Sequence, residues 1–332
     1  MVRIAVDAMG GDHAPLAIVR GAEAACAEKI AEVVLVGDEH VIAPLLKDRS
    51  GIEIVHTPVS VGMDESPSIA LRRKRDSSMN TAFSLLRSGR VQAAVSAGNS
   101  GAAMAFAIFT LGRIPGVERP AILTLHPNLN GTMSALIDAG GTVDCRPSHL
   151  VQFALMGNAF AQYALDILKP RVGLLSNGQE ETKGNELTRE THVILKSLSL
   201  NYLGYVEGND LYNGTTDVVV TDGFVGNVAL KVSEGVAEVL IALLKEQIAR
   251  SANANLLSDV FKALSRTGDY SEYGGMPLVG VDGVCIICHG KSNERAIKNA
   301  ILKAKNLVGK HLNEHIRDAM QEHPSQIGNK ER

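Results

Sequence analysis

The chain has 332 residues, of which 45% are hydrophobic and 21% are charged, and its net charge is −3. This composition is ordinary for a globular protein with a core of normal size, and the charge gives no global attraction to a polyanion. Only 4% of the residues are aromatic and none is tryptophan. Stacking on nucleobases is therefore disfavoured, and we expect no nucleic acid partner.

Four cysteines do not make a disulfide framework in a chain of this length, which favours a reducing, cytoplasmic location. The start of the chain has no signal-peptide pattern, and no run reaches about 18 apolar residues. We therefore expect no membrane-spanning helix. Peripheral contact with a membrane surface stays open.

Apolar segments with the length of strands alternate with helical patterns along the chain. The strand-like segments are 3–8, 31–38, 51–57, 91–101, 121–126, 133–141, 171–178, 201–208, 217–227 and 280–290. Helical patterns between them include 150–168, 186–198 and 293–308. This alternation is typical of a mostly parallel sheet with helices on both faces. The length suits either one large α/β domain or two domains sharing a cleft, and no clean linker marks a boundary.

Several of these strands run into loops of small polar residues. The loops are "DAMGGDH", "SAGNSGA", "DAGGTVD", "SNGQEETKGNE", "TDGFVGN" and "CHGKSN". Turn residues and helix caps alone explain any one such loop. Six of them, with acids at strand ends, favour a shared site, because the carboxyl ends of parallel strands meet along one edge. Glycines and helix N-termini at that edge suit an anionic ligand.

The first of these loops lies in "VDAMGGDHAP", where Gly10 and Gly11 allow a tight turn. Pro15 suits a first helical turn, and Asp12 or His13 is placed to cap that helix. Capping does not explain both acids and the histidine together. A histidine beside glycines at a helix N-terminus can contact an anion or move a proton. The dinucleotide pattern G-x-G-x-x-G is missing here.

Two later loops offer further anion contacts. In "SAGNSGA", Asn99 and Ser100 can cap a helix, and the N–H groups through Gly101 can receive phosphate oxygens. In "ETKGNELT", Lys183 lies beside Asn185 ahead of a helix, which suits a phosphate or oxyanion partner. A solvated surface lysine is the alternative.

"TDGFVGN" places Asp222 at a strand end and Asn227 where it can cap the next helix or polarise a carbonyl group. Cys285 and Cys288 resemble a redox C-x-x-C pair, but they lie in an apolar run. Positions i and i+3 of a strand face opposite sides, so buried cysteines are favoured. His289 follows this run directly and precedes "GKSN".

Two segments allow contact with a partner. The basic run "RRKR" at 72–75 is either a solvated helix face or a dock for an acidic protein or anionic ligand. The segment 253–268 has apolar residues at helical spacing, which suits a core helix, a dimer interface or a helix lying on a membrane.

Together, the quoted loops and their flanking residues resemble the signature segments of the bacterial phosphate acyltransferase family (PlsX), in order, from residue 2 to about residue 310. The resemblance implies an enzyme that transfers a fatty acyl group from acyl carrier protein to inorganic phosphate, giving acyl phosphate for phospholipid synthesis. It implies no cofactor or metal. It also implies one three-layer α/β/α domain over 1–332, akin to isocitrate and isopropylmalate dehydrogenases. A homodimer and a helical excursion at about 228–275 that touches the membrane are implied as well. One departure is that Gly141 stands where the family usually has asparagine.

For this chemistry we expect direct attack by phosphate on the thioester, without an enzyme nucleophile. Lys183 would neutralise phosphate or the oxyanion, Asn185 and Asn227 would donate to the carbonyl oxygen, and His13 or Asp222 would relay a proton. The phosphate-binding candidates are Gly10, Gly11, Asp12, Asn99, Ser100, Gly101, Asn185 and His289. The run 72–75 becomes a candidate dock for acyl carrier protein.

Two other functions remain in view. The first is an NAD- and Mg²⁺-dependent decarboxylating dehydrogenase on the same fold, which needs a cluster of acids for Mg²⁺ and a nicotinamide-binding loop. Asp7, Asp12, Asp138 and Asp222 could be misread as such a cluster, but no cofactor fingerprint is evident. The second is a non-catalytic adaptor that binds acyl carrier protein without consuming it.

Overall fold

The computed structural model describes residues 1–250 and 270–323. In this part of the chain, eleven strands form one mixed sheet in the order β3-β2-β1-β4-β11-β10-β5-β6-β9-β7-β8. Each of the ten strand-like segments overlaps one of these strands. The strands are β1 Arg3–Asp7, β2 Glu32–Gly37, β3 Ile52–His56, β4 Ala93–Ser96, β5 Ala121–Pro127, β6 Met133–Ile137, β7 Val172–Leu175, β8 Tyr202–Val206, β9 Val218–Val220, β10 Met276–Val279 and β11 Val284–Ile287.

The sheet has two halves whose strands run in opposite directions. Strands β1, β2, β3, β4 and β11 pair in parallel, and β5 runs the same way because β10 is antiparallel to both β11 and β5. Strand β6 is antiparallel to β5, and β9, β7 and β8 follow the direction of β6. The carboxyl ends of the two halves therefore point in opposite directions.

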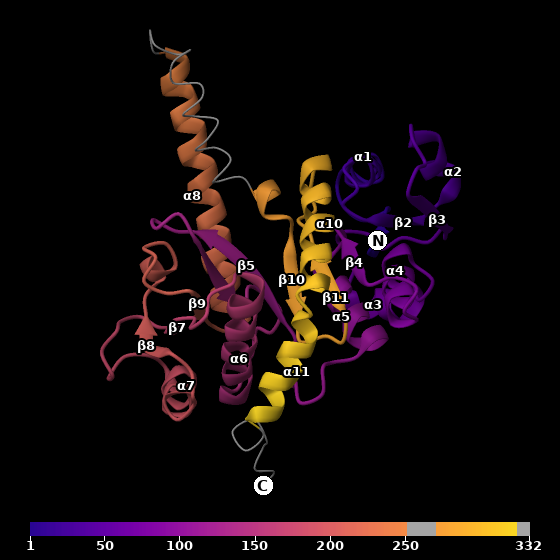
Figure 1. The fold of residues 1–332 in the computed structure, drawn as a ribbon. Helices are drawn as coiled ribbons and strands as arrows, with labels where there is room; N and C mark the ends of the chain where they lie inside the picture. The colour runs from indigo at the N-terminus through magenta and orange to yellow at the C-terminus, as the bar shows by residue number, and fades with distance from the viewer. Residues whose placement is uncertain (251–269, 324–332) are drawn as a thin grey trace.

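Helices cover both faces of the sheet (Figure 1). The predicted helical segments are confirmed as α6 Pro147–Ala164, α7 Glu186–Lys196 and α10 Glu294–Gly309. The other helices are α1 Leu16–Ala27, α2 Glu39–Ile42, α3 Pro67–Arg73, α4 Ser78–Arg87, α5 Ser100–Leu111, α8 Gly223–Arg250 and α11 Leu312–Glu322, with 3-10 turns at Ala43–Leu45, Gly208–Leu211 and Tyr270–Tyr273.

The core lies in separate layers on the two faces. Helices α1, α6, α10 and α11 share one buried cluster with Ala93 and Val95 of β4, and α4 and α5 share another with Ala94. This alternation is the two-residue period of a strand that is buried on both sides. Cys285 and Cys288 likewise enter opposite clusters, and both are buried free thiols, as predicted. The predicted α/β/α architecture is confirmed.

Strand β10 was not predicted from the sequence. It has only four residues, and Pro277 at its second position has no N–H group to donate to a neighbouring strand. Its place between β11 and β5 nevertheless makes it the strand that joins β5 to the other strands of the first half of the sheet.

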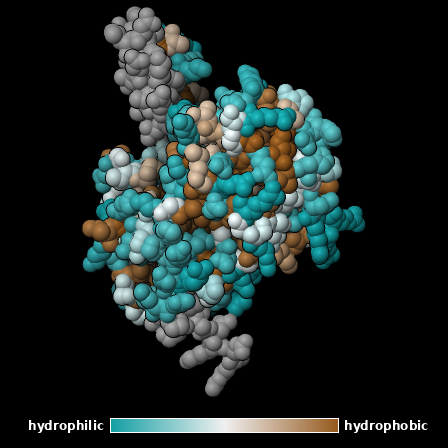
Figure 2. All heavy atoms as spheres, turned by 45° about the vertical axis from the view of Figure 1, so that its right-hand side comes forward, coloured by the Kyte–Doolittle hydropathy of each residue, from teal (hydrophilic) through white to brown (hydrophobic). Residues whose placement is uncertain are grey.

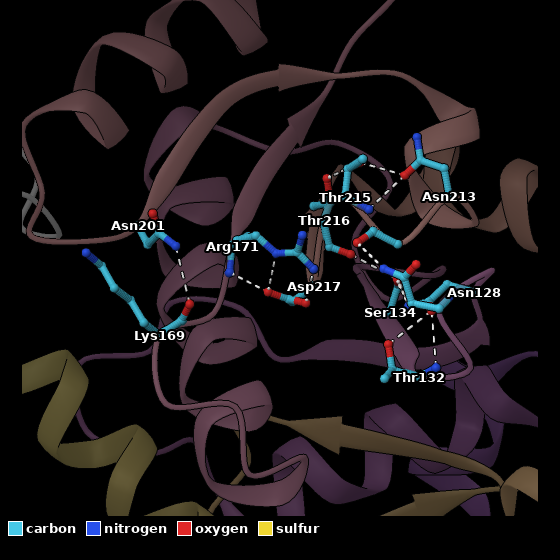
Figure 3. Close-up of polar contacts among 12 residues, drawn as sticks. Asn128, Thr132, Ser134, Lys169, Arg171, Asn201, Asn213, Thr215, Thr216 and Asp217 are labelled. Carbon is cyan, nitrogen blue, oxygen red and sulfur yellow. Dashed lines mark hydrogen bonds and ion pairs between the residues drawn. The ribbon is translucent and has the colours of Figure 1, made fainter.

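Polar contacts hold the far half of the sheet together (Figure 3). The Arg171 guanidinium donates two hydrogen bonds to the Asp217 carboxylate, at 2.8 and 3.0 Å, and so joins the residues ahead of β7 to those ahead of β9. Asn128 closes the β5–β6 hairpin, because its Oδ1 accepts from the Thr132 N–H and hydroxyl groups and its Nδ2 donates to Ser134 Oγ.

Helix α8 has 28 residues and extends well beyond the sheet (Figure 1). It begins at Gly223, immediately after β9, and its first turns pack against the loop that follows β6. A Cβ atom on Gly226 would lie 1.8 Å from the Asp138 carbonyl oxygen, so this position has no room for a side chain. The first part of the excursion predicted over 228–275 is thus helix α8. The helix predicted at 253–268 lies outside the described residues.

We predict that Gly226→Ala lowers the free energy of unfolding by about 3 kcal/mol, because the added methyl group forces α8 away from its seat. Gly235→Ala is the matched control on the same helix, since nothing lies within 4 Å of its Cβ position. That control should raise stability by roughly 0.5–1 kcal/mol through helix propensity. Denaturant unfolding of both variants measures the difference, and equal stabilities would contradict the packing described here.

Candidate functional site

Three loops are tied together at the carboxyl ends of β1, β4 and β11. Ser96 Oγ donates to the buried Asp7 carboxylate at 2.7 Å and accepts from the Gly98 N–H. The Asp12 N–H donates to the Gly290 carbonyl at 2.8 Å. Gly10 lies inside this junction, where a Cβ atom would be 2.5 Å from Asp7 Oδ2. Burial raises the pKa of Asp7, whose role here is to join strand ends.

Asn99 fixes the start of α5, as predicted. Its Oδ1 accepts from the Ala102 N–H, and its Nδ2 donates to the carbonyl oxygens of Met63 and Glu65. These hydrogen bonds involve both polar atoms of the Asn99 side chain, which therefore has a structural role. The first N–H groups of α5, at Ser100 and Gly101, have no partner within the helix, and a helix N-terminus favours an anion.

A hollow of about 390 Å³, called the α5 hollow below, opens beside this helix start. Four residues singled out from the sequence line it, namely Asp12, Ser100, Asn227 and His289. Loops from both halves of the sheet meet here. The full lining is Asp12, Met63, Gly98, Ser100, Ile122, Ala139, Gly140, Asn227, Leu230, Lys231, Glu234, Met276, Cys288, His289 and Gly290.

Lys231 and Glu234 were missed from the sequence. Their side chains form an ion pair at 2.6 Å on α8. Together with Asn227 and Leu230 they follow the spacing i, i+3, i+4 and i+7, which is one face of a helix. This helical period is the signal in the sequence that marks them, because neither residue belongs to a polar loop after a strand.

His289 lines the α5 hollow, and one of its ring nitrogens accepts a backbone hydrogen bond. Its Nδ1 accepts from the Lys291 N–H at 3.2 Å. Burial lowers the pKa of this imidazole, and the neighbouring Lys231 charge adds to the effect. The neutral ring therefore carries its proton on Nε2, where it is a hydrogen-bond donor.

A second hollow of about 500 Å³, called the α7 hollow, lies on the other side of the first turn of α8. Asn185 and Asp222 line it with Ser176, Asn177 and Thr188. Asn185 caps α7 through the Thr188 N–H, and Asp222 accepts from the Phe224 and Val225 N–H groups at the start of α8. Lys183 is half-buried beside Gly178 in the same loop.

The structure changes two capping predictions. Helix α1 has Pro15 at its N-cap and no side-chain cap, so neither Asp12 nor His13 caps it. His13 instead lines a third groove with Arg20, Lys47 and Arg295. Asn227 does not cap α8 either, because the helix begins four residues earlier, at Gly223, and Asp222 takes that role.

Asp138 anchors the loop between β6 and α6. Its buried carboxylate accepts from the N–H groups of Ile122, Gly141 and Thr142, at 2.8, 2.9 and 2.6 Å. A Cβ atom at Gly141 would lie 2.7 Å from Met104 Cε and 2.9 Å from Asp138 Oδ1, so glycine fits this position. No asparagine side chain is needed at this position, because backbone N–H groups close the loop on Asp138.

We predict a pH-dependent contribution from Asp138. Burial raises the pKa of its carboxyl from 3.8 to about 6, so the folded state holds this proton more tightly than the unfolded chain. Stability from this group is therefore present at low pH and falls as the pH rises through about 6. The difference in unfolding free energy between the native chain and Asp138→Asn should shrink by up to about 3 kcal/mol from pH 4 to pH 7. A difference that grows over this range would contradict the assignment.

A smaller apolar hollow, called the inner hollow, adjoins the α5 hollow. The two share Leu230, Glu234, Met276 and His289. The inner hollow continues to Thr124, Leu125, Tyr273, Gly275, Ser292 and Ala296. A charged and amide-lined space thus opens into an apolar one.

The four aspartates that could be misread as a metal-binding cluster do not lie together. Asp12 lies in the α5 hollow and Asp222 in the α7 hollow, while Asp7 and Asp138 are buried and bonded to neighbouring groups. Within the described residues, no group of three or more histidine, cysteine, aspartate or glutamate residues is arranged to hold a metal ion. In the same part of the chain, no helix is both long and apolar enough to cross a membrane.

Residues 2–315 match the model of a family described as "Fatty acid synthesis protein". The phosphate acyltransferase of Geobacter sulfurreducens is 50% identical over 328 residues, covering 96% of this chain and 94% of the relative. That of Trichlorobacter lovleyi is 51% identical, covering 97% and 95%. The chain belongs to the phosphate acyltransferase family. Members of this family are acyltransferase enzymes, so the resemblance found in the sequence is confirmed.

Solved structures place this phosphate acyltransferase family member in a wider fold group. A phosphotransacetylase from Streptococcus pyogenes has a TM-score of 0.64 at 14% identity, covering 93% of this chain and 94% of its own. A 4-hydroxythreonine-4-phosphate dehydrogenase from Klebsiella pneumoniae has a TM-score of 0.55 at 14% identity, covering 96% and 100%. At this identity the likeness establishes the shared fold.

Proposed function

We propose that this protein transfers a fatty acyl group from acyl carrier protein to inorganic phosphate, in the α5 hollow. The observation that carries the proposal is the junction of two unlike spaces. A helix N-terminus, a lysine, an asparagine and a neutral histidine surround the outer space, and apolar side chains line the inner one. An acyl thioester meeting phosphate needs this pairing of surfaces.

Phosphate binds at the start of α5 in this proposal. The Ser100 and Gly101 N–H groups and the positive end of the helix dipole favour its oxygens. Lys231 supplies a full positive charge on the facing helix, balanced in the free protein by Glu234. Phosphate thus replaces part of an existing ion pair, which limits the cost of desolvating the lysine.

Asn227 and His289 bind the thioester carbonyl in this proposal. The Asn227 amide and the His289 Nε2–H group donate to the carbonyl oxygen, and both stabilise the negative charge that forms on it. A phosphate oxygen attacks the carbonyl carbon and forms a C–O bond. The tetrahedral intermediate then collapses, the C–S bond breaks, and the carrier thiolate leaves with the electron pair. Phosphate is itself a competent nucleophile at neutral pH, so the geometry has only to hold the two reactants in line.

We predict that Lys231→Ala lowers kcat/KM for phosphate by about 100-fold, with little change in folding, because a charge facing the transferred group is lost. Lys245→Ala, on an exposed turn of the same helix, is the matched control and should keep native turnover. Native turnover in Lys231→Ala would end the proposal for the α5 hollow.

Lys183→Ala tests the position that the sequence analysis gave to the anion contact, which lies outside the α5 hollow. Lost turnover in Lys183→Ala together with native turnover in Lys231→Ala would place phosphate beside the α7 hollow.

The first carbons of the acyl chain occupy the inner hollow in this proposal, since a volume of about 80 Å³ holds only a few methylene groups. Leu125, Leu230 and Met276 offer it apolar contact, and Ala296 leaves space beside them. Burying methylene groups there supplies binding energy that a phosphate site alone lacks.

We predict that Leu125→Phe disfavours fatty acyl groups relative to acetyl, because the larger ring fills the inner hollow, which an acetyl group does not need. The ratio of kcat/KM for a sixteen-carbon acyl carrier protein to that for a two-carbon one should fall about tenfold. Leu168→Phe is the control, since Leu168 is 92% exposed and lines none of these hollows. An unchanged ratio in Leu125→Phe would place the acyl chain elsewhere.

We also propose a homodimer that forms through α8, and peripheral contact of the protein with membrane lipid. Val228, Val232, Val236, Val239 and Leu243 lie on one face of this helix and are each 47% to 60% exposed. A stripe of this kind on a protruding helix is typical of a covered surface.

We predict that Val232→Glu combined with Val236→Glu yields a monomer in sedimentation experiments, because charges replace the centre of this stripe. The control is Val193→Glu on α7, where the side chain is 69% exposed. It should sediment like the native chain. A double variant that keeps the native sedimentation coefficient would rule out α8 as the interface.

A further inference from the structure

Helix α3 lies at the mouth of the α5 hollow. Met63, just ahead of the helix, lines the hollow, and the Asn99 amide holds the Met63 and Glu65 carbonyls against the start of α5. Pro67, the first residue of α3, sits so close to Gly101 that a Cβ atom there would be 2.9 Å from its ring. Whatever binds on α3 is therefore next to the proposed phosphate position.

The basic run 72–75 separates into two parts in the structure. Lys74 Nζ donates to the Ser60 carbonyl and to the Glu65 carboxylate, so its positive charge is paired within 60–74. Arg72, Arg73 and Arg75 are exposed. Within the described residues none of these three has an ion pair with a carboxylate, which leaves their guanidinium groups in contact with solvent.

Apolar side chains accompany these arginines. Ile69 is 48% exposed and Met63 is 37% exposed. Ile69, Arg72 and Arg73 follow helical spacing i, i+3 and i+4, so they share one face of α3. We call Met63, Ile69, Arg72, Arg73 and Arg75 the α3 surface. An apolar centre with a basic rim is the form of an interface that an acidic protein would fit.

We propose that the α3 surface docks the acidic acyl carrier protein and delivers its thioester to the α5 hollow. This inference rests on the function proposed above. The other groove with several basic residues, beside α1 and α10, is a weaker candidate, because Arg20 and Arg295 there pair with Glu23 and Glu272. Exposed, unpaired guanidinium groups also give long-range attraction, which speeds encounter with an acidic partner and weakens as salt rises.

The test compares two thioesters in one assay, palmitoyl carrier protein and palmitoyl-pantetheine, each with inorganic phosphate. Arg72→Glu combined with Arg73→Glu should raise KM for the carrier protein at least tenfold, with kcat unchanged, and should leave kinetics with palmitoyl-pantetheine as in the native chain. The salt dependence of kcat/KM for the carrier protein should also flatten. The control is Arg49→Glu combined with Lys169→Glu, which changes the net charge equally at exposed positions away from α3.

The outcomes separate the two proposals. If the native protein consumes neither thioester, the proposed function fails. If the native protein consumes both, but the α3 variant matches the control with carrier protein, the docking proposal is overturned. An equal loss with both thioesters would also overturn it, since a docking surface acts only on the carrier. A thermal unfolding midpoint equal to that of the control confirms that the α3 variant is folded.

Discussion

The Asp138 carboxylate is the constraint on which the α5 and α7 hollows depend. It is buried at the end of β6, and the three backbone N–H groups that it accepts from fix the loop up to Thr142 against β5. The Thr142 carbonyl in turn accepts from the Gly223 N–H, where α8 begins. Gly226 then packs directly against the Asp138 backbone. The position of α8 follows from these contacts.

Helix α8 connects the site to the rest of the molecule. Its first turn borders the α7 hollow through Asp222 and Val225, and its second and third turns present Asn227, Lys231 and Glu234 to the α5 hollow. Its outer part carries the exposed apolar stripe. One helix thus links the proposed transfer centre to the proposed dimer interface. Because a displacement of α8 would move both, the tight seat made by the glycines at 223 and 226 has a functional consequence.

The sequence predicted the strands well because most of them are continuous apolar runs, which buried parallel strands require. The exception, β10, is short and contains Pro277, so its place depends on neighbours far away in the chain. The capping role of Asn99 was also predictable, since an asparagine before a small-residue helix has few other uses. Ser100, Asn227 and His289 were correctly singled out as residues that line one space.

The rest required tertiary information. The polar loops were expected to meet along one edge, but the reversal between β5 and β6 points the two sets of strand ends in opposite directions. Asn185 and Asp222 therefore lie in a different hollow from Ser100 and His289. Lys231 and Glu234 were not predicted because they belong to a helix face. That face lines the site only through the packing of α8 against the loop after β6. The sequence indicated one basic patch at 72–75. Only the structure shows that Lys74 is paired while the neighbouring arginines are exposed.

The central claim is acyl transfer to phosphate. The most direct measurement mixes the purified protein with long-chain acyl carrier protein and inorganic phosphate, and traps acyl phosphate with hydroxylamine. We predict phosphate-dependent formation of the hydroxamate together with an equal amount of free carrier protein. Binding of the acylated carrier without any phosphate-dependent product would contradict the account and would make the protein an adaptor.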